Sequence, residues 1–254
     1  MVCCKRVAGK LAMAAMLWLG AFSLVRGQQP PVHFWHPAGL PPGAIGGQQL
    51  ARGGPLPGFF QPVEIRTPAK VLIALAERGR FREPTAGPIR VGLLVGQVYR
   101  LAVINLPNQP GVAVYPTIEV VDRLYAPRGM ETRFPVLIEL TREDLELAAQ
   151  GKFVTRVVYV EDPQAALPAP ATGDQSWFDV APGMDPLTVA DSLGRPIAIV
   201  RMGGRVPDGG EVDMGFLFGC PPVVNLPPPA APPTESKSKP VPPAPKSRQE
   251  APPK

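Results

Sequence analysis

Proline and glycine confine the foldable part of this chain to its middle. Residues 28–58 contain seven prolines and seven glycines, and residues 221–254 contain 13 prolines. Segments of this kind, without a repeat period, bury too little apolar surface to offset the entropy lost on folding. We therefore expect two disordered arms around one domain at residues 59–220, which is long enough to enclose a hydrophobic core.

The first 27 residues have the pattern of an export signal. Three basic residues precede an uncharged, mostly apolar run from Leu11 to Val25. This run is shorter than the roughly 20 apolar residues that span a bilayer. Small or modest side chains then end the segment at Gly27, as signal peptidase requires. The pattern predicts a signal peptide at residues 1–27, no integral membrane span in the mature chain, and an exported protein that is periplasmic, associated with the cell envelope or secreted.

Short apolar runs separated by glycine and proline indicate β-structure in the middle domain. They are rich in valine, isoleucine, leucine or tyrosine, with the punctuation of hairpins and meanders. The expected strands are 63–66, 71–76, 90–95, 98–105, 112–122, 134–140, 153–160 and 197–200. Residues 71–76 also fit a short helix. Pro116 predicts an edge strand or a bulge at 112–122, whereas the two apolar faces of 153–160 predict a central strand.

Two short helices are marked by their first residues. Thr141 with Asp144 three residues later is a variant of the capping box, and Gly151 ends that helix. The pair Asp185-Pro186 opens a second helix, over residues 186–193.

This succession of elements predicts a mainly β fold. Seven or so strands, roughly ten residues apart, with two short helices favour an immunoglobulin-like β-sandwich, and an α+β domain is the alternative. The strand, helical turn and strand from Phe134 to Val160 resemble the E–F corner of immunoglobulin-like domains. The paired cysteines and the tryptophan between them that are typical of such domains are missing.

The middle domain lacks the residues that most enzyme sites need. Both histidines of the chain, His33 and His36, precede residue 59. Their position excludes a Ser-His-Asp triad, a Cys-His pair and His-ligated zinc from that domain. Its glycine pairs lack the patterns of a phosphate loop or a dinucleotide site. We therefore expect no catalytic residues, no cofactor and no metal site, and a protein that is not an enzyme.

Carboxylates and aromatic side chains remain as candidates for a binding surface. The acidic residues lie near the ends of predicted strands, and their spacing does not show whether they meet in a cleft, as the carboxylates of a glycosidase do. We therefore favour the interpretation that they are charged residues at strand ends or ion-pair partners of the arginines of the domain. The candidate partner-binding residues are Glu119, Asp122, Tyr125, Glu161, Asp162 and Trp177.

The net charge and the cysteines limit the partners further. The formal charge of the chain is +5, yet the leader and the two arms carry all the excess, which leaves −3 for residues 59–220. A mildly acidic domain gives no reason to expect nucleic acid as a partner. Cys220 is the single cysteine after the leader, so no intrachain disulfide is possible. It is either a small buried side chain or the link of a disulfide-linked dimer.

Four segments of the chain resemble a known group of sequences. They are VGLLVGQVYR at 91–100, YPTIEVVDRLY at 115–125, residues 140–163 and residues 185–207. They resemble a family of exported planctomycete-type bacterial proteins to which no activity is assigned. The resemblance implies export and a single-domain core, and it supplies no functional residues.

These observations predict a structural or interaction protein of the cell envelope. Its β domain would bind a protein or a wall polymer, and the Pro- and Lys-rich tail would act as a semi-stiff spacer. A carbohydrate-binding module is the first alternative. A carboxylate-based glycan hydrolase is the second, and it requires the candidate carboxylates to share a cleft.

Overall fold

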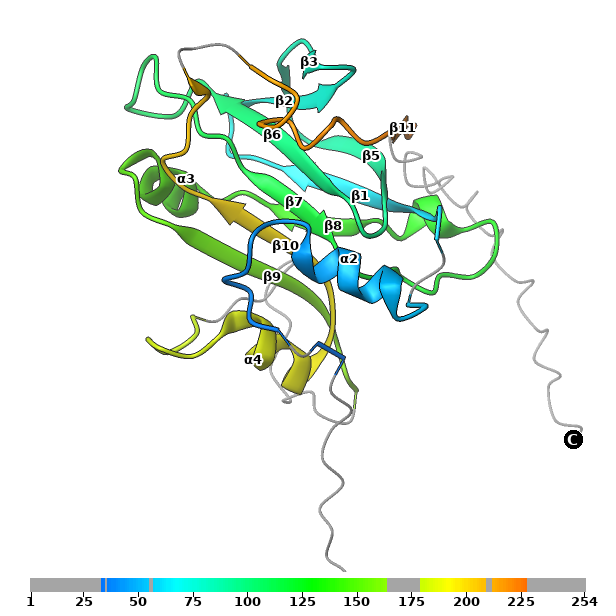
Figure 1. The fold of residues 1–254 in the computed structure, drawn as a ribbon. Coiled ribbons are helices and arrows are strands. Elements are labelled where there is room, and N and C mark those ends of the chain that lie inside the picture. Colours follow the sequence, from blue (N-terminus) through cyan, green and yellow to red (C-terminus); the bar gives the residue numbers. More distant parts are fainter. Residues whose placement is uncertain (1–32, 35, 55–56, 164–178, 209–211, 228–254) are drawn as a thin grey trace, which may run out of the picture.

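In the computed structural model, the protein is mainly β, with two sheets packed face to face and a few short helices (Figure 1). The structure describes residues 33–34, 36–54, 57–163, 179–208 and 212–227. The predicted signal peptide, Trp177 and most of the predicted tail lie outside these residues. The β-sandwich expected from the sequence is confirmed.

The larger sheet has the order β3-β2-β6-β7-β10-β9, with β4 paired to β2, and all its pairs are antiparallel. The smaller sheet has the order β11-β5-β1-β8, in which β1 and β8 are parallel. The strands of the larger sheet are β2 Leu72–Glu77, β3 Arg80–Phe81, β4 Thr85–Ala86, β6 Val98–Ile104, β7 Thr117–Val120, β9 Val154–Glu161 and β10 Gly194–Met202. Those of the smaller sheet are β1 Phe60–Arg66, β5 Ile89–Leu94, β8 Val136–Glu139 and β11 Val223–Asn225.

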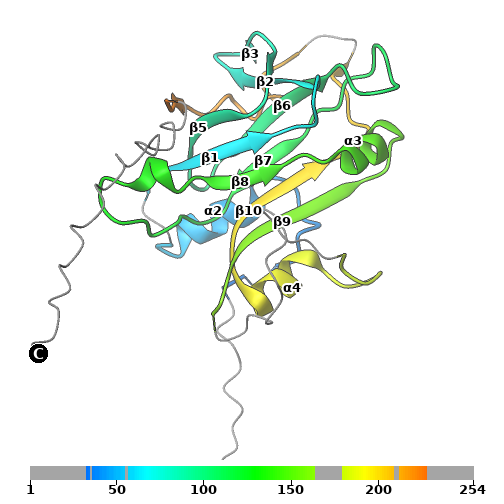
Figure 2. The same ribbon diagram turned by 180° about the vertical axis from the view of Figure 1, so that it is seen from behind.

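The main core lies between the two sheets. Alternate residues of the strands point inward, for example Val63 and Ile65 of β1 against Leu101 of β6 and Val200 of β10. Figure 2 shows the smaller sheet in front, with β1 beside β8. Successive side chains of a strand point to opposite faces, so apolar residues at every second position lie together on the face toward the core.

Both helix predictions are confirmed at their first residues. Helix α3, Arg142–Ala149, begins after Thr141, whose hydroxyl accepts the N–H of Asp144 at 3.1 Å. Helix α4, Pro186–Leu193, begins after Asp185, whose carboxylate accepts the N–H of Thr188 at 2.8 Å. Helix α3 joins β8 of the smaller sheet to β9 of the larger one, so this unit crosses between the sheets. The 3₁₀ turn Glu131–Arg133 precedes β8. No helix in the described ranges is long and apolar enough to cross a membrane.

Two predictions of strand position are wrong. Strand β9, expected at the centre, is the last strand of its sheet, and most of its residues are half-buried. The region around Pro116, expected at an edge or bulge, leads into β7, which lies between β6 and β10. Strand β7 begins after the proline, but its pairing with β6 continues past it: the N–H of Leu101 donates to the carbonyl of Pro116 at 2.9 Å, and Val103 pairs with Val114. The proline thus costs the ladder one N–H donor without placing the strand at an edge. The position of a strand within a sheet depends on its pairing with distant segments, so the sequence of that strand alone does not encode it.

The N-terminal arm is the main correction to the predicted domain organisation. Residues 28–58 were expected to be disordered, but residues 33–54, Trp35 apart, contain helix α2, Ala44–Ala51, and lie across the outer face of the larger sheet (Figure 1). We call this segment the N-terminal strap. Its buried side chains, Phe34, Ala38 and Ile45, pack with Val121, Leu187 and Ile199.

Polar contacts fix the strap at several points along its length. The His33 backbone N–H and imidazole both contact the Asp191 carboxylate at 2.8 Å. The N–H of Ala38 donates to the Asp185 carboxylate at 2.7 Å. An added Cβ at Gly46 would approach the Gly96 backbone to 3.0 Å, so glycine permits this close contact.

The domain also extends beyond Cys220, its predicted end. Strand β11 pairs with β5, and the buried Tyr99 hydroxyl connects the two regions. This hydroxyl accepts the N–H of Leu94 at 2.7 Å and donates to the carbonyl of Pro222 at 2.9 Å. The folded unit therefore includes residues from both predicted arms.

Substituting Tyr99 by Phe tests this connection through pH. The variant leaves the N–H of half-buried Leu94 without this acceptor and the carbonyl of exposed Pro222 without this donor. We therefore expect its free energy of unfolding at pH 8 to be about 1 kcal/mol below that of the wild type. Burial raises the pKa of Tyr99 to about 12. Because the pKa of Tyr99 is higher in the folded than in the unfolded protein, the free energy of unfolding of the wild type falls as the pH rises from about 10, by up to about 1.4 kcal/mol per pH unit. Tyr99→Phe has no hydroxyl to titrate, so the difference in free energy of unfolding between wild type and variant should become smaller between pH 8 and 11, as measured by urea unfolding. A difference that does not change with pH would contradict the burial of the Tyr99 hydroxyl.

Candidate functional site

Glu119 is an interior residue of the sheet rather than a surface carboxylate. It is completely buried on the outer face of β7, beneath the N-terminal strap. One carboxylate oxygen receives a hydrogen bond from Arg201 Nη1 at 2.6 Å, and the other receives the N–H of Gly46 at 2.7 Å. Arg201 also donates from Nε to the carbonyl of Ala38 at 3.0 Å. Glu119 is thus unavailable to a partner, and its contacts hold the strap.

Asp122 is also mostly buried and paired. Its carboxylate accepts a hydrogen bond from Arg195 Nη1 at 2.5 Å and another from the N–H of Arg123 at 2.7 Å. The same Arg195 nitrogen donates to the carbonyl of Arg123 at 2.9 Å. Asp122 therefore fixes the guanidinium group of Arg195 and the backbone of Arg123, and it presents little of its own surface.

The other two candidate carboxylates lie apart from this pair. Glu161 and Asp162 are exposed where β9 ends, and Glu161 is opposite Gly194 in the sheet. The N–H of Asp162 donates to the carbonyl of Leu193 at 3.0 Å. Because Glu119 is enclosed beneath the strap, it cannot share an open cleft with the exposed Glu161 and Asp162, as the two carboxylates of a hydrolase do.

Tyr125 is the candidate whose surroundings are those of a binding residue. It is 65% exposed, among the most exposed large side chains described. The guanidinium carbon of Arg123 lies 4.3 Å from the centre of the Tyr125 ring, and that of Arg195 lies 4.9 Å from it. Arg123 also lies 5.1 Å from the ring of Phe59. We call Phe59, Asp122, Arg123, Tyr125 and Arg195 the Tyr125 platform.

The Tyr125 platform holds its exposed ring in place. Contacts between a guanidinium group and an aromatic face are attractive by about 0.5–1 kcal/mol at exposed sites. Arg195 is in turn fixed by Asp122, and the Nε atom of Arg123 is buried without a hydrogen-bond partner in the described residues. The sequence analysis identified Tyr125 and Asp122 but missed both arginines. Arg195 reaches the platform from β10, 70 residues along the chain, so local sequence gives no signal for it.

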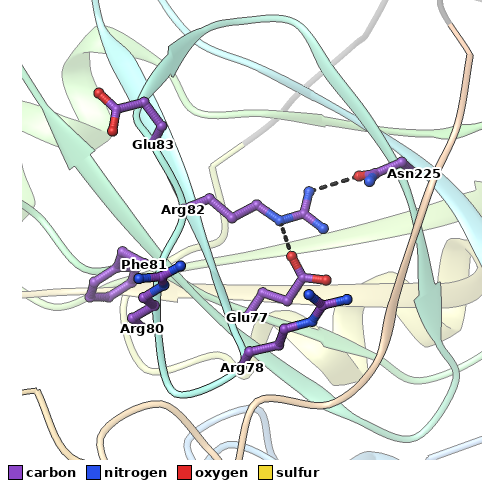
Figure 3. Close-up of a pocket in the computed structure, with 7 residues that line it drawn as sticks. All are labelled: Glu77, Arg78, Arg80, Phe81, Arg82, Glu83 and Asn225. Atoms are coloured by element: carbon purple, nitrogen blue, oxygen red, sulfur yellow. Dashed lines mark hydrogen bonds and ion pairs between the residues drawn. The ribbon is translucent and has the colours of Figure 1, made fainter.

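A second polar feature lies at the hairpin of β2 and β3. A hollow of about 580 Å³ is lined by Glu77, Arg78, Arg80, Phe81, Arg82, Glu83 and Asn225 (Figure 3). Arg82 donates to the Glu77 carboxylate at 2.5 Å and to the Asn225 side-chain oxygen at 2.7 Å. The hydrogen bond from Arg82 lowers the pKa of Glu77. The residues predicted from the sequence do not include this site, although its three arginines stand at alternate positions in ERGRFRE.

Metal and thiol chemistry find little support in the described residues. Within the described ranges, no group of three or more His, Cys, Asp or Glu side chains is placed to hold a metal ion. Cys220 is half-buried with a free thiol, and its sulfur accepts the N–H of Gly79 at 3.3 Å. A disulfide-linked dimer through Cys220 stays a prediction.

Comparison with known proteins adds no assignment. The sequence matches no protein-family model, no curated protein and no solved structure.

Proposed function

We propose that this protein is an exported interaction protein of the cell envelope, which binds a protein or a wall polymer through the Tyr125 platform. The observation that carries the proposal is an exposed tyrosine ring fixed between two arginines. Tyrosine and arginine are enriched among the residues that dominate binding energy at protein interfaces. A ring that is already held in place loses less conformational entropy when a partner covers it.

The burial of the carboxylates supports a binding role over hydrolysis. Glu119 and Asp122 each have an arginine partner within 2.6 Å, and neither is exposed. A general acid must be within hydrogen-bond reach of its substrate, which a carboxylate enclosed by protein groups is not.

A carbohydrate-binding module has less support than a protein or polymer interface. Such a module needs several exposed rings in a row to stack on successive sugars. Tyr125, Phe134 and Phe153 are the most exposed aromatic side chains described. Tyr125 and Phe134 lie in the segment between β7 and β8, whereas Phe153 precedes β9. Phe153 is away from the Tyr125 platform, because Tyr125 contacts Arg195 at the opposite end of the antiparallel pair β9 and β10. The aromatic ring contacts among the described residues do not join Tyr125 to another exposed ring.

Replacing Tyr125 by Ser tests the proposed interface. We expect recovery of the partner from a solubilised envelope fraction to fall about tenfold or more, as for the loss of a central aromatic anchor. The fold should be unaffected because the ring is mostly exposed. The matched control is Phe153→Ser, which removes another exposed ring away from the platform and should leave recovery unchanged.

The same pull-down has a clear opposing outcome. Equal recovery by the wild type and Tyr125→Ser would remove the platform from the interface. Equal losses in Tyr125→Ser and Phe153→Ser would mean that capture depends on general surface hydrophobicity.

A further inference from the structure

The hairpin between β2 and β3 has an arginine where the backbone favours a different residue. Strand β2 ends at Glu77, strand β3 begins at Arg80, and Arg78-Gly79 form the two-residue turn. Both turn residues have positive φ, 52° for Arg78 and 80° for Gly79. Turns of this type favour Asn, Asp or Gly at the first position because a larger side chain is strained there. Strained positions of this kind occur preferentially at functional sites.

Side-chain direction gathers positive charge on one face of the hairpin. Glu77 pairs with Arg80 and Ala76 pairs with Phe81, so Arg80 and Arg82 share the face of Glu77 while Phe81 points the other way. Phe81 packs beside Ala76, Phe216 and Leu217, which fixes the orientation of the strand. The hairpin therefore presents its arginines from a rigid support.

Hydrogen bonds hold one of these three arginines in place and leave the other two available to a ligand. Arg82 is held by Glu77 and Asn225 (Figure 3). Arg78 and Arg80 are exposed, and neither has a hydrogen bond or an ion pair within the described ranges. Because the side-chain oxygen of Asn225 accepts from Arg82, the amide N–H groups of Asn225 remain available as donors.

We propose that the hollow at this hairpin binds a phosphate group. Its donors come from two arginines and one amide in different directions, and they suit a tetrahedral group with several acceptor oxygens better than a planar carboxylate. Arginine binds phosphate through paired N–H donors. Glu77 is paired with Arg82, and Glu83, which also lines the hollow, points away from the Arg82–Asn225 contact in Figure 3. Three arginines against two glutamates leave the lining with a formal positive charge. The volume of about 580 Å³ leaves room for the molecule that carries the phosphate.

Substitution at Arg78 separates binding from folding. Glycine adopts positive φ without strain, so Arg78→Gly should fold with a thermal midpoint equal to or above that of the wild type. We expect its affinity for inorganic phosphate, measured by calorimetry, to fall about tenfold, the usual loss for a hydrogen bond to a charged group. Arg80→Gln should have a similar effect. Arg78→Lys keeps the charge without the paired donors, and its loss should be intermediate.

The control is Arg128→Gln, which removes an exposed arginine of the loop between β7 and β8. It should bind phosphate like the wild type. Equal weakening by Arg128→Gln and Arg78→Gly would overturn the proposal, because attraction would then follow net charge alone. Wild-type affinity in both Arg78→Gly and Arg80→Gln would overturn it as well.

Two further probes identify the source of the phosphate. Glycerol phosphate represents a soluble ester, and vesicles that contain phosphatidylglycerol represent a lipid headgroup. Binding to any of the three probes that is lost in Arg78→Gly supports the site and names its source, whereas binding to none of them overturns it. Tyr125→Ser should retain phosphate binding, so a failure of the Tyr125 platform and a failure of this site are distinguishable.

Discussion

Replacing Arg201 by Met is expected to lower the free energy of unfolding by about 3–5 kcal/mol, the usual cost of removing one partner of a buried ion pair. Arg201 is 3% exposed and Glu119 is fully buried, with 2.6 Å between their charged groups. The substitution leaves the Glu119 carboxylate with a single hydrogen bond, from the N–H of Gly46. A buried charge without its counter-ion is far more costly than the pair itself.

The double variant Arg201→Met/Glu119→Met gives the matched comparison. Two apolar side chains of similar length remove both charges, and such replacements are often neutral or stabilising. We expect most of the lost stability to return in urea unfolding followed by circular dichroism. A double variant as unstable as Arg201→Met alone would contradict the charge argument. It would assign the loss to the two hydrogen bonds that anchor the N-terminal strap, from Arg201 to the carbonyl of Ala38 and from the N–H of Gly46 to Glu119.

A pair with one exposed partner provides the scale for this effect. Arg66 and Glu64 are 2.8 Å apart, and the Arg66 side chain is 39% exposed, whereas Glu64 is mostly buried. Glu64 keeps Arg90 as a second partner at 3.3 Å, so removing Arg66 leaves no buried charge without a counter-ion, and the loss should be about 0–1 kcal/mol, as for exposed pairs. Arg66→Met should therefore cost much less than Arg201→Met, although both remove an arginine from a sheet.

The features that the sequence predicted correctly are those with local causes. The Thr141 hydroxyl caps a backbone N–H three residues later, and the Asp185 carboxylate does the same. These hydrogen bonds join neighbours in the chain, so a short motif encodes them. The apolar run at 71–76, which also fitted a helix, forms strand β2, Leu72–Glu77, between β6 and the short strands β3 and β4. Mainly β composition on either side favoured that outcome.

The features that the sequence left unpredicted depend on distant partners. Glu119 lies within β7, and its burial requires Arg201 from β10 and Gly46 from the N-terminal strap. Both are more than 70 residues away. The Tyr125 platform likewise needs Arg195 from β10. A strand pattern gives the face of a residue but not which segment covers that face.

The N-terminal strap is folded, although its average composition predicts disorder. Its prolines and glycines predict disorder on average. Three apolar side chains, Phe34, Ala38 and Ile45, nevertheless find complementary positions on the sheet. The glycine at position 46 lets the helix approach the backbone of Gly96, which a larger residue would prevent. A few well-placed residues thus outweigh the average of the segment.

A chain shortened to residues 59–220 is expected to lose its cooperative fold. The deletion removes the buried side chains of Phe34 and Ile45, each of which contributes about 1.5–3 kcal/mol. It also removes strand β11 and the Pro222 carbonyl that receives the Tyr99 hydroxyl. The combined loss of about 5 kcal/mol or more is comparable to the whole stability of many domains. Circular dichroism should show a broad thermal transition or none.

The matched control is a chain of residues 33–227, which keeps the N-terminal strap and β11. Its free energy of unfolding should lie within about 1 kcal/mol of that of the full chain, because every described contact is retained. A cooperative transition of 59–220 at the same temperature as 33–227 would contradict the role of the strap.

The comparison of 59–220 with 33–227 also decides which chain is suitable for binding experiments. If 59–220 fails to capture a partner, the cause is unfolding rather than loss of an attachment arm, so the contribution of the outer segments must be measured against 33–227.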